Sequence, residues 1–248
     1  MYDGDRPAVE ALWRAIATSL RSQGLDDVPD AVEWPVDLAA HWRDPALLLS
    51  QTCSYPLTHQ LLHRVQVVGA FRYSAEGCEG ISYRSMLVAR AADAGRHWGD
   101  FKGRRLAANS LDSQSGFNCL RAAIPDVDAA SDPFFAQVVI SGSHRQSIEA
   151  VRGGHADIAA IDCVTLASLK RVDRYLMEGL CVVGDTAPTP GLPLITSLDA
   201  SPRQILLLRR VLKSLFEDAA LAPVREALLL DAFEPVGWSA YEGLRQAA

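Results

Sequence analysis

The sequence predicts an α/β fold in which mostly parallel sheets are flanked by helices. Apolar segments with the pattern of strands alternate with amphipathic helical segments along the 248 residues. Two short segments rich in Ala, Gly or Pro, near 91–95 and 185–190, enclose a middle block of about ninety residues. Polar residues directly follow several strands. We therefore expect two lobes, 1–92 with 186–248 and an inserted 93–185, with a ligand cleft between them.

Two of the predicted helices have clear start signals. In 5–23, Asp5 can cap the first turn, Pro7 suits that turn, and apolar residues recur at helical spacing up to Gly24. The second helix begins at Ser201, which is followed by a proline and by Gln204, and it continues to Phe216. Weaker helical patterns cover 38–42, a segment from residue 56, 109–123 beyond its polar start, 143–152, 163–169, 224–230 and 238–244.

The predicted strands are short and apolar. The segment 65–71 is rich in β-branched residues, and 81–90 alternates between two faces after a glycine-containing loop. We expect these two strands to be neighbours in one sheet. Further strands are predicted at 46–49, 104–108, 137–140, 156–161 and 180–184.

Composition and charge exclude several classes of protein. The chain is 49% hydrophobic and 22% charged, which is typical of a globular protein. Its net charge of −6 and its scattered basic residues argue against nucleic-acid binding. No apolar run approaches the roughly 18 residues of a membrane span. Asp3 and Asp5 stand where a secretion signal carries positive charge, so the sequence alone leaves a cytoplasmic location open.

The five cysteines do not have the spacing of a metal site. No CxxC pair is present, and no histidine lies at zinc-finger spacing, so we expect neither a metal nor a cofactor. An odd number also excludes a complete disulfide framework. Cys53 and Cys78 both flank loop-like segments and could pair in an oxidising compartment, which the sequence leaves open.

Several polar corners follow predicted strands and are candidates for a binding site. A helix N-terminus offers free N–H groups and a positive dipole end to an anion, and hydroxyls beside it add donors. Each of these residues also has a purely structural alternative. Ser113 and Asp162 could simply cap helices, His144 could lie at the surface, and Tyr55 and Tyr83 could pack in the core. The corners are Gln51-Thr52 with Tyr55, Asn109 to Gly116, Ser141 to His144, and Asp162.

The sequence does not favour an enzyme. Cys53, His144 and Asp162 supply the residue types of a thiol-nucleophile triad, but nothing in the sequence brings them within hydrogen-bond reach. Neither a GxSxG elbow nor a GxxxxGK[ST] phosphate loop is present. We therefore expect no catalytic residues.

The corners resemble a known family of binding proteins. The chain resembles the substrate-binding proteins of phosphate, phosphite and phosphonate ABC transporters, which have the type II periplasmic-binding-protein fold. The similar segments occur in the family's order over nearly the whole chain. They are Ser50 to Pro56, Gly77 to Gly80 with Tyr83 to Ser85, Asn109 to Gly116, Gly142 to His144, Gly154 to Asp162, and Pro190 to Pro193.

The resemblance implies a binding protein that is not an enzyme. Its two lobes would close on a small anion, a phosphonate, phosphite or phosphate, and present it to the permease of an ABC importer in the periplasm. The Ser-x-Ser-Gly helix start would hold the anion's oxygens, and Asp162 would meet an amine on the ligand. The implied ligand residues are Gln51, Thr52, Tyr55, Tyr83, Ser85, Asn109, Ser113, Gln114, Ser115, Gly116, His144 and Asp162.

Two departures from the family's pattern affect these expectations. Family members have an apolar strand directly before the Met-Tyr-Asp that begins this chain, so we expect the sheet of the first lobe to lack a central strand. The characterised phosphonate binders are only distant relatives of the branch with Gln51-Thr-Cys53. Another small ligand, such as a pyrimidine or a thiamine precursor, therefore stays open as an alternative.

Overall fold

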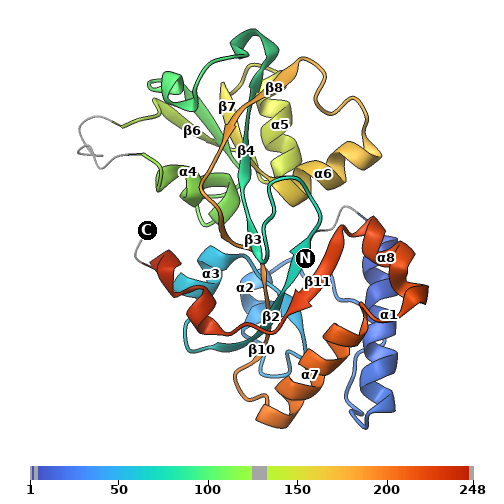
Figure 1. Ribbon diagram of the computed structural model, residues 1–248. Helices are drawn as coiled ribbons and strands as arrows, with labels where there is room; N and C mark the ends of the chain where they lie inside the picture. The colour runs from blue at the N-terminus through green and yellow to red at the C-terminus, as the bar shows by residue number, and fades with distance from the viewer. Residues whose placement is uncertain (1, 3–4, 125–132, 246–248) are drawn as a thin grey trace. The chain divides into compact units, whose positions relative to one another are not determined.

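The computed structural model describes residue 2 and residues 5–124 and 133–245, which form two compact units. The first unit contains the chain up to Ser74 and again from Pro190, and the second contains Ala75–Thr189. Figure 1 shows that helices flank a sheet in each unit. The α/β class is therefore confirmed. Each unit has its own sheet and its own buried apolar clusters.

The first unit has a four-stranded sheet with the order β1-β10-β2-β11. Every pair in it is antiparallel. Parallel strands were predicted for most of the fold, which is wrong for this sheet, because β10 runs between β1 and β2 in the opposite direction. The strands are β1 (Ser50–Gln51), β2 (Val65–Tyr73), β10 (Pro193–Ser197) and β11 (Leu230–Glu234).

Two long helices cover one face of this sheet. In α1 (Arg6–Ser22), Asp5 accepts a hydrogen bond from the Ala8 N–H at 3.0 Å, and Pro7 lies in the first turn, as predicted. Ser201 caps α7 (Pro202–Ser214) in the same way. Figure 1 shows the two helices side by side. Their apolar stripes and the sheet bury one cluster, which includes Leu12, Ile16, Leu20, Phe71, Leu208, Leu212 and Phe233.

Shorter segments complete the first unit. The opposite face of the sheet buries Val67, Ile195 and the ring of Tyr241. Strand β11 was not predicted, because its five residues stand between helical patterns and show little alternation. It pairs with β2, placing Phe233 opposite Phe71. The helices of this part are α2 (Leu38–Trp42), α3 (Ser54–His59) and α8 (Ala222–Ala227), with 3₁₀ turns at Ala219–Leu221, Trp238–Ala240 and Glu242–Arg245.

The second unit has a five-stranded sheet with the order β6-β5-β7-β4-β8. Strand β5 pairs in parallel with β6 and β7, whereas β4 is antiparallel to β7 and β8. Parallel pairing is thus restricted to one half of the sheet. The strands are β4 (Ser85–Arg90), β5 (Arg105–Ala108), β6 (Gln137–Ile140), β7 (Ile158–Asp162) and β8 (Leu180–Asp185). A separate two-stranded sheet joins β3 (Ser82–Tyr83) to β9 (Thr189–Pro190).

The predicted pairing of 65–71 with 81–90 is wrong. Strand β2 lies in the first sheet, and β4 lies between β7 and β8 in the second. The segment 91–99, which was predicted to be a crossing, forms the 3₁₀ turns Ala91–Asp93 and Trp98–Phe101 within the second unit. The chain therefore passes from the first unit to the second between Ser74 and Ala75, before β4 and not after it. The composition of this loop resembles that of an ordinary turn.

Both faces of the second sheet are buried at its central strand β7. Along β7, Ile158 and Ala160 contribute to one apolar cluster, whereas Ala159 and Ile161 contribute to the other. This alternation is the period of a strand, and burial on both faces explains the continuous apolar run in the sequence. The helices of this unit are α4 (Cys119–Arg121), α5 (His144–Arg152) and α6 (Cys163–Val172).

Candidate functional site

One edge of the second sheet gathers most of the predicted ligand residues. Because β5 is parallel to both β6 and β7, the carboxyl ends of these three strands meet at one edge. Asn109 follows β5, the Ser141–His144 corner follows β6, and Asp162 ends β7. Ser85, at the start of the antiparallel β4, is paired with Asp162 in the sheet register. This part of the prediction, polar corners on a shared edge, is confirmed within the second unit.

The stretch after Asn109 contains a π turn. Sequence patterning predicted an ordinary helix, but the structure has a π-helical segment, Gln114–Asn118, followed by α4. Ser113 caps it, and its Oγ accepts a hydrogen bond from the Gly116 N–H at 3.0 Å. The Gly116 N–H, predicted to hold an anion, is therefore paired within the turn. Single π turns recur at functional sites because they redirect side chains.

A close approach at Gly116 fixes Asn109 in this turn. A Cβ added at Gly116 would lie 1.7 Å from the Asn109 Oδ1 and 3.2 Å from the Ser113 Oγ. Only glycine leaves room for the Asn109 amide at this position. The backbone carbonyl of Asn109 also accepts from the Gly142 N–H at 3.1 Å, which connects the turn to the corner after β6. The glycine of the Ser-x-Ser-Gly pattern therefore has a packing reason that the sequence does not show.

Ser115 is the centre of the hydrogen bonds at this edge. Its Oγ lies 3.0 Å from the Nε2 of His144, the first residue of α5. Its backbone carbonyl accepts from the Ser85 Oγ at 2.8 Å and from the Cys119 Sγ at 2.9 Å. Ser115 is only 5% exposed, and Ser85 only 1%. The structure therefore brings Ser85, Ser115 and His144 into one connected group of hydrogen bonds.

The remaining predicted residues of this unit are also buried. Asp162 accepts from the Thr165 N–H at 2.9 Å, so the predicted alternative of a cap for α6 is correct. Gln114 is 6% exposed, and Tyr83, in β3, is 2% exposed. Neither side chain is at the surface. Buried polar side chains at a sheet edge are typical of a ligand site.

Two residues that support this group were not predicted. The Oγ of Thr186 accepts from the Ser85 N–H at 3.1 Å, and Thr186 is 4% exposed. The Nδ2 of Asn118 donates to the Leu111 and Ser113 carbonyls. Thr186 lies in the Pro-rich segment after β8, where local composition indicates only a connection. Thr186 reaches Ser85 only because β8 pairs with β4, and the sequence around Thr186 does not reveal this pairing.

The imidazole of His144 is uncharged near neutral pH. Burial of the ring lowers its pKa from 6.5 to about 4, and the Ala160 carbonyl partly offsets this effect. Its Nδ1 has no contact with solvent. An uncharged ring can donate from one nitrogen and accept at the other. His144 is therefore a hydrogen-bonding group at this edge and does not supply positive charge.

This lowered pKa predicts a loss of stability in mild acid. Between pH 6.5 and about 4 the unfolded chain protonates this histidine while the folded chain does not, so acidification through that window favours unfolding. Protonation of His144 can lower the free energy of unfolding by at most about 3 kcal/mol across this window. Urea unfolding at pH 7, 5.5 and 4.5 should show a smaller pH-dependent decline for His144→Gln than for the unmodified chain. Equal declines would contradict the buried, neutral ring.

The predicted residues of the first unit have a different setting. The Gln51 Nε2 donates to the Tyr73 hydroxyl at 3.1 Å and to the Leu192 carbonyl at 3.2 Å. Thr52 is 1% exposed, and its N–H donates to the Pro193 carbonyl. Tyr55, in α3, stacks on His59 with ring centroids 4.0 Å apart. These three residues belong to the first unit, whereas the other nine predicted residues belong to the second.

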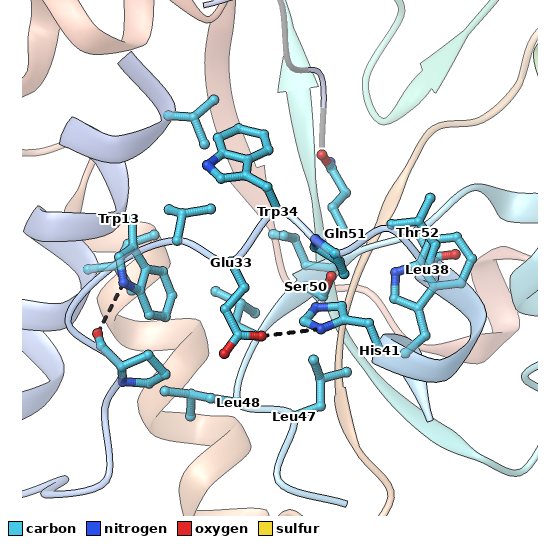
Figure 2. A pocket seen from close by; sticks show the side chains of 18 of the residues that line it. Trp13, Glu33, Trp34, Leu38, His41, Leu47, Leu48, Ser50, Gln51 and Thr52 are labelled. Atoms are coloured by element: carbon cyan, nitrogen blue, oxygen red, sulfur yellow. Dashed lines mark hydrogen bonds and ion pairs between the residues drawn. The ribbon is translucent and has the colours of Figure 1, made fainter. Parts of the chain in front are cut away.

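The first unit also contains a cavity of about 640 Å³, which Figure 2 shows from close by. It lies beside β1, the edge strand of its sheet, and α1 forms one wall. Two pairs of polar groups lie at its rim: the Trp13 Nε1 donates to the Pro29 carbonyl at 3.1 Å, and the Glu33 Oε2 lies 3.6 Å from the His41 Nδ1. Apolar side chains dominate the rest, including Val9, Leu12, Ile16, Trp34, Trp42, Leu47 and Leu48. The mainly apolar lining suits an apolar group, and the polar residues Ser50, Gln51 and Thr52 line it at β1 and directly after it.

The described residues contain no other feature that suggests a different class of site. No group of three or more His, Cys, Asp or Glu side chains in this part of the chain could hold a metal ion. None of the helices in 5–124 and 133–245 has the length and apolarity needed to cross a bilayer. The strand-end edge of the second unit is therefore the best candidate for the functional site.

The fold and this edge define a class of protein, the two-unit α/β solute-binding proteins of the type II periplasmic fold. Comparison with known families then identifies the branch. Residues 48–241 match the model for the periplasmic substrate-binding protein of phosphonate ABC transporters, and the chain belongs to this family. Its members bind substrates for transport and are not enzymes. No curated protein sequence matches the chain significantly.

Solved structures show the same fold at low sequence identity. PhnD1 from Prochlorococcus marinus, in complex with methylphosphonate, is 13% identical, with a TM-score of 0.75 over 98% of this chain and 93% of that one. A binding protein component of a phosphonate ABC transporter from Pseudomonas aeruginosa is 16% identical, with a TM-score of 0.74 over 96% of this chain and 80% of that one. At such identity these similarities establish the fold alone.

Proposed function

We propose that this chain captures a small phosphorus oxyanion, such as a phosphonate, phosphite or phosphate, for import by an ABC transporter. The observation that carries this proposal is the hydrogen-bonded group of the buried Ser85 and Ser115 with the half-buried His144, which adjoins the Ser113-capped turn. The family membership supports the transport role, and PhnD1 with methylphosphonate is a fold relative that holds such a ligand. A permease is the partner that this role requires, and the family is periplasmic.

Neutral donors hold the anion in this proposal. The hydroxyls of Ser113 and Ser115, the Asn109 amide and the uncharged His144 ring can each donate one hydrogen bond to an oxygen, and several such bonds together compensate a dispersed negative charge. The bonds now made among these groups would be exchanged for bonds to the ligand. Gln51, Thr52, Tyr55, Tyr83, Gln114 and the Gly116 turn complete the proposed ligand set, and Asp162 would meet an amine on the ligand.

Calorimetric titration with a panel of anions tests this proposal. Phosphate, phosphite and methylphosphonate are titrated into the purified chain, with sulfate and acetate as controls. At least one phosphorus oxyanion is expected to bind with a dissociation constant in the micromolar range or below, and acetate is expected not to bind. If none of the three phosphorus compounds binds, the anion proposal fails.

The alternatives make different predictions. A pyrimidine or thiamine precursor would be retained as a mass increment in native mass spectrometry without any response to phosphorus anions. The family membership argues against a Cys53-dependent enzyme. Cys53 directly precedes α3 in the first unit, whereas His144 and Asp162 belong to the second. Alkylation of Cys53 at the rate of a model thiol would agree with its assignment as a binding-protein residue.

A further inference from the structure

Two cysteine side chains are in contact within the second unit. The Sγ atoms of Cys78 and Cys163 are 3.5 Å apart, and the two residues are 85 positions apart in the sequence. The other thiols have different neighbours: the Cys119 Sγ donates to the Ser115 carbonyl, and the Cys181 Sγ donates to the Arg90 carbonyl at 3.3 Å. Cys53, which the sequence suggested as a partner for Cys78, belongs to the first unit.

Main-chain hydrogen bonds hold the loop that carries Cys78. The Cys78 N–H donates to the Ala75 carbonyl at 3.1 Å, and Glu79 and Ser82 exchange two hydrogen bonds of 2.9 Å each. Gly77 has φ of +96°, a conformation that favours glycine. A Cβ at Gly77 would lie 3.2 Å from the Cβ of Cys163 and 2.7 Å from the Met86 Cε. The loop therefore passes directly over Cys163, which sets the distance between the two sulfurs.

The start of α6 holds Cys163 equally firmly. Cys163 is the first residue of the helix, it is 2% exposed, and its N–H donates to the Arg84 carbonyl at 3.1 Å. The hydrogen bond from Cys78 and backbone hydrogen bonds with Arg84 and Val164 lower the pKa of the Cys163 thiol, whereas the hydrogen bond with Cys163 and burial raise the pKa of Cys78. Cys78 is partly exposed and so is open to reagents. The pair thus consists of an accessible thiol and a buried neighbour that ionises more readily.

We propose that Cys78 and Cys163 form a disulfide that fastens the loop before β3 to the start of α6. The oxidant is another disulfide, either a small one such as oxidised glutathione or that of a disulfide oxidoreductase. Exchange first places a mixed disulfide on Cys78 and releases one thiol. The Cys163 thiolate then attacks the Cys78 sulfur, forming the new S–S bond and breaking the mixed one, and the departing thiolate takes up a proton. Two protein thiols are oxidised, and one external disulfide is reduced to two thiols.

The cross-link requires only a small change at the two side chains. The sulfurs must approach from 3.5 Å to about 2.05 Å, and we expect rotation about the side-chain bonds of the partly exposed Cys78 to supply this change. The link would enclose β4, β5, β6 and β7 in one covalent loop. Long loops lose much conformational entropy in the unfolded chain when they are closed, so we expect the oxidised unit to melt at a higher temperature.

Thiol counting by mass spectrometry tests this proposal. The purified chain is incubated with oxidised or reduced glutathione and then unfolded in guanidinium chloride with N-ethylmaleimide, so that buried thiols also react, before it is digested and analysed. After oxidation, only Cys53, Cys119 and Cys181 are expected to be alkylated, and the peptides of Cys78 and Cys163 are expected to be linked. After reduction, all five cysteines are alkylated. The oxidised protein should melt at least about 5 °C higher than the reduced one.

Two variants separate the cross-link from other effects of oxidation. In Cys78→Ser, the partly exposed member of the pair, Cys163 should be alkylated after oxidation, and the melting temperature should not depend on the redox state. Cys181→Ser is the matched control and should keep the linked peptides and the full shift. Alkylation of all five cysteines after oxidation would overturn the proposal, as would a linked peptide that joins Cys53 to Cys78.

Discussion

Ser115→Asp is expected to abolish binding of whichever phosphorus oxyanion the unmodified chain binds. The new carboxylate would take the place of the Ser115 hydroxyl, which lies 3.0 Å from the His144 Nε2. Ser115 is only 5% exposed, so this carboxylate would be buried. No basic side chain takes part in the hydrogen bonds described for this group, and the His144 ring is uncharged near neutral pH. The new carboxylate and the anionic ligand would repel each other by several kcal/mol in this buried group, so the affinity for the anion should fall by at least about a hundredfold.

Two further variants distinguish charge from the loss of a hydroxyl. Ser115→Ala removes one donor without adding charge and should weaken binding by about tenfold. Ala122→Asp places a carboxylate on an exposed residue at the end of α4, the helix that follows the π turn of Ser115, and should leave affinity unchanged. All three are measured by calorimetry after circular dichroism has confirmed folding. A folded Ser115→Asp variant that binds as tightly as the unmodified chain would exclude this edge as the anion site.

Local sequence signals predicted the helices that begin with a capping residue and a proline. Helices α1 and α7 begin at the predicted caps, because a capping side chain with a proline in the first turn determines the start of a helix with little help from the rest of the fold. Strand β7 was also predicted, since its apolar run reflects burial on both faces. The polar corners after β5, β6 and β7 followed from these strands. Their shared edge could therefore be predicted from the order of strands and helices along the chain.

Pairing between distant segments could not be predicted in this way. In β4, Leu87 and Val88 are both completely buried, so the alternation of the sequence does not indicate which sheet receives the strand. The contact of Ser85 with Ser115 and the support from Thr186 both depend on that pairing. The contact between Cys78 and Cys163 likewise joins a loop to a helix 85 residues later. Each of these contacts is tertiary and has no signature in spacing or composition.

Gly69→Ala is expected to be the most destabilising of the proposed substitutions in the first unit. Gly69 lies in β2, opposite Leu194, and a Cβ there would approach to 2.5 Å both the Glu234 carbonyl oxygen and the Phe233 ring. The carbonyl belongs to β11, which is paired with β2, so it cannot move away without loss of the pairing. The ring is part of the main apolar cluster of this unit. Overpacking of this kind costs about 3 kcal/mol, at the upper end of the usual range.

Unfolding measurements with a second glycine variant test the reason for this loss. Gly237→Ala is the matched control, because a Cβ at that residue would have no neighbour within 4 Å, and it should change stability by less than about 0.5 kcal/mol. Gly69→Ala should lower the melting temperature by about 6–12 °C. It should also expose the β2–β11 amides to hydrogen exchange before those of the second unit. A loss no larger than that of Gly237→Ala would show that β11 can shift away from β2 at no cost, and the four-stranded arrangement would then be in error.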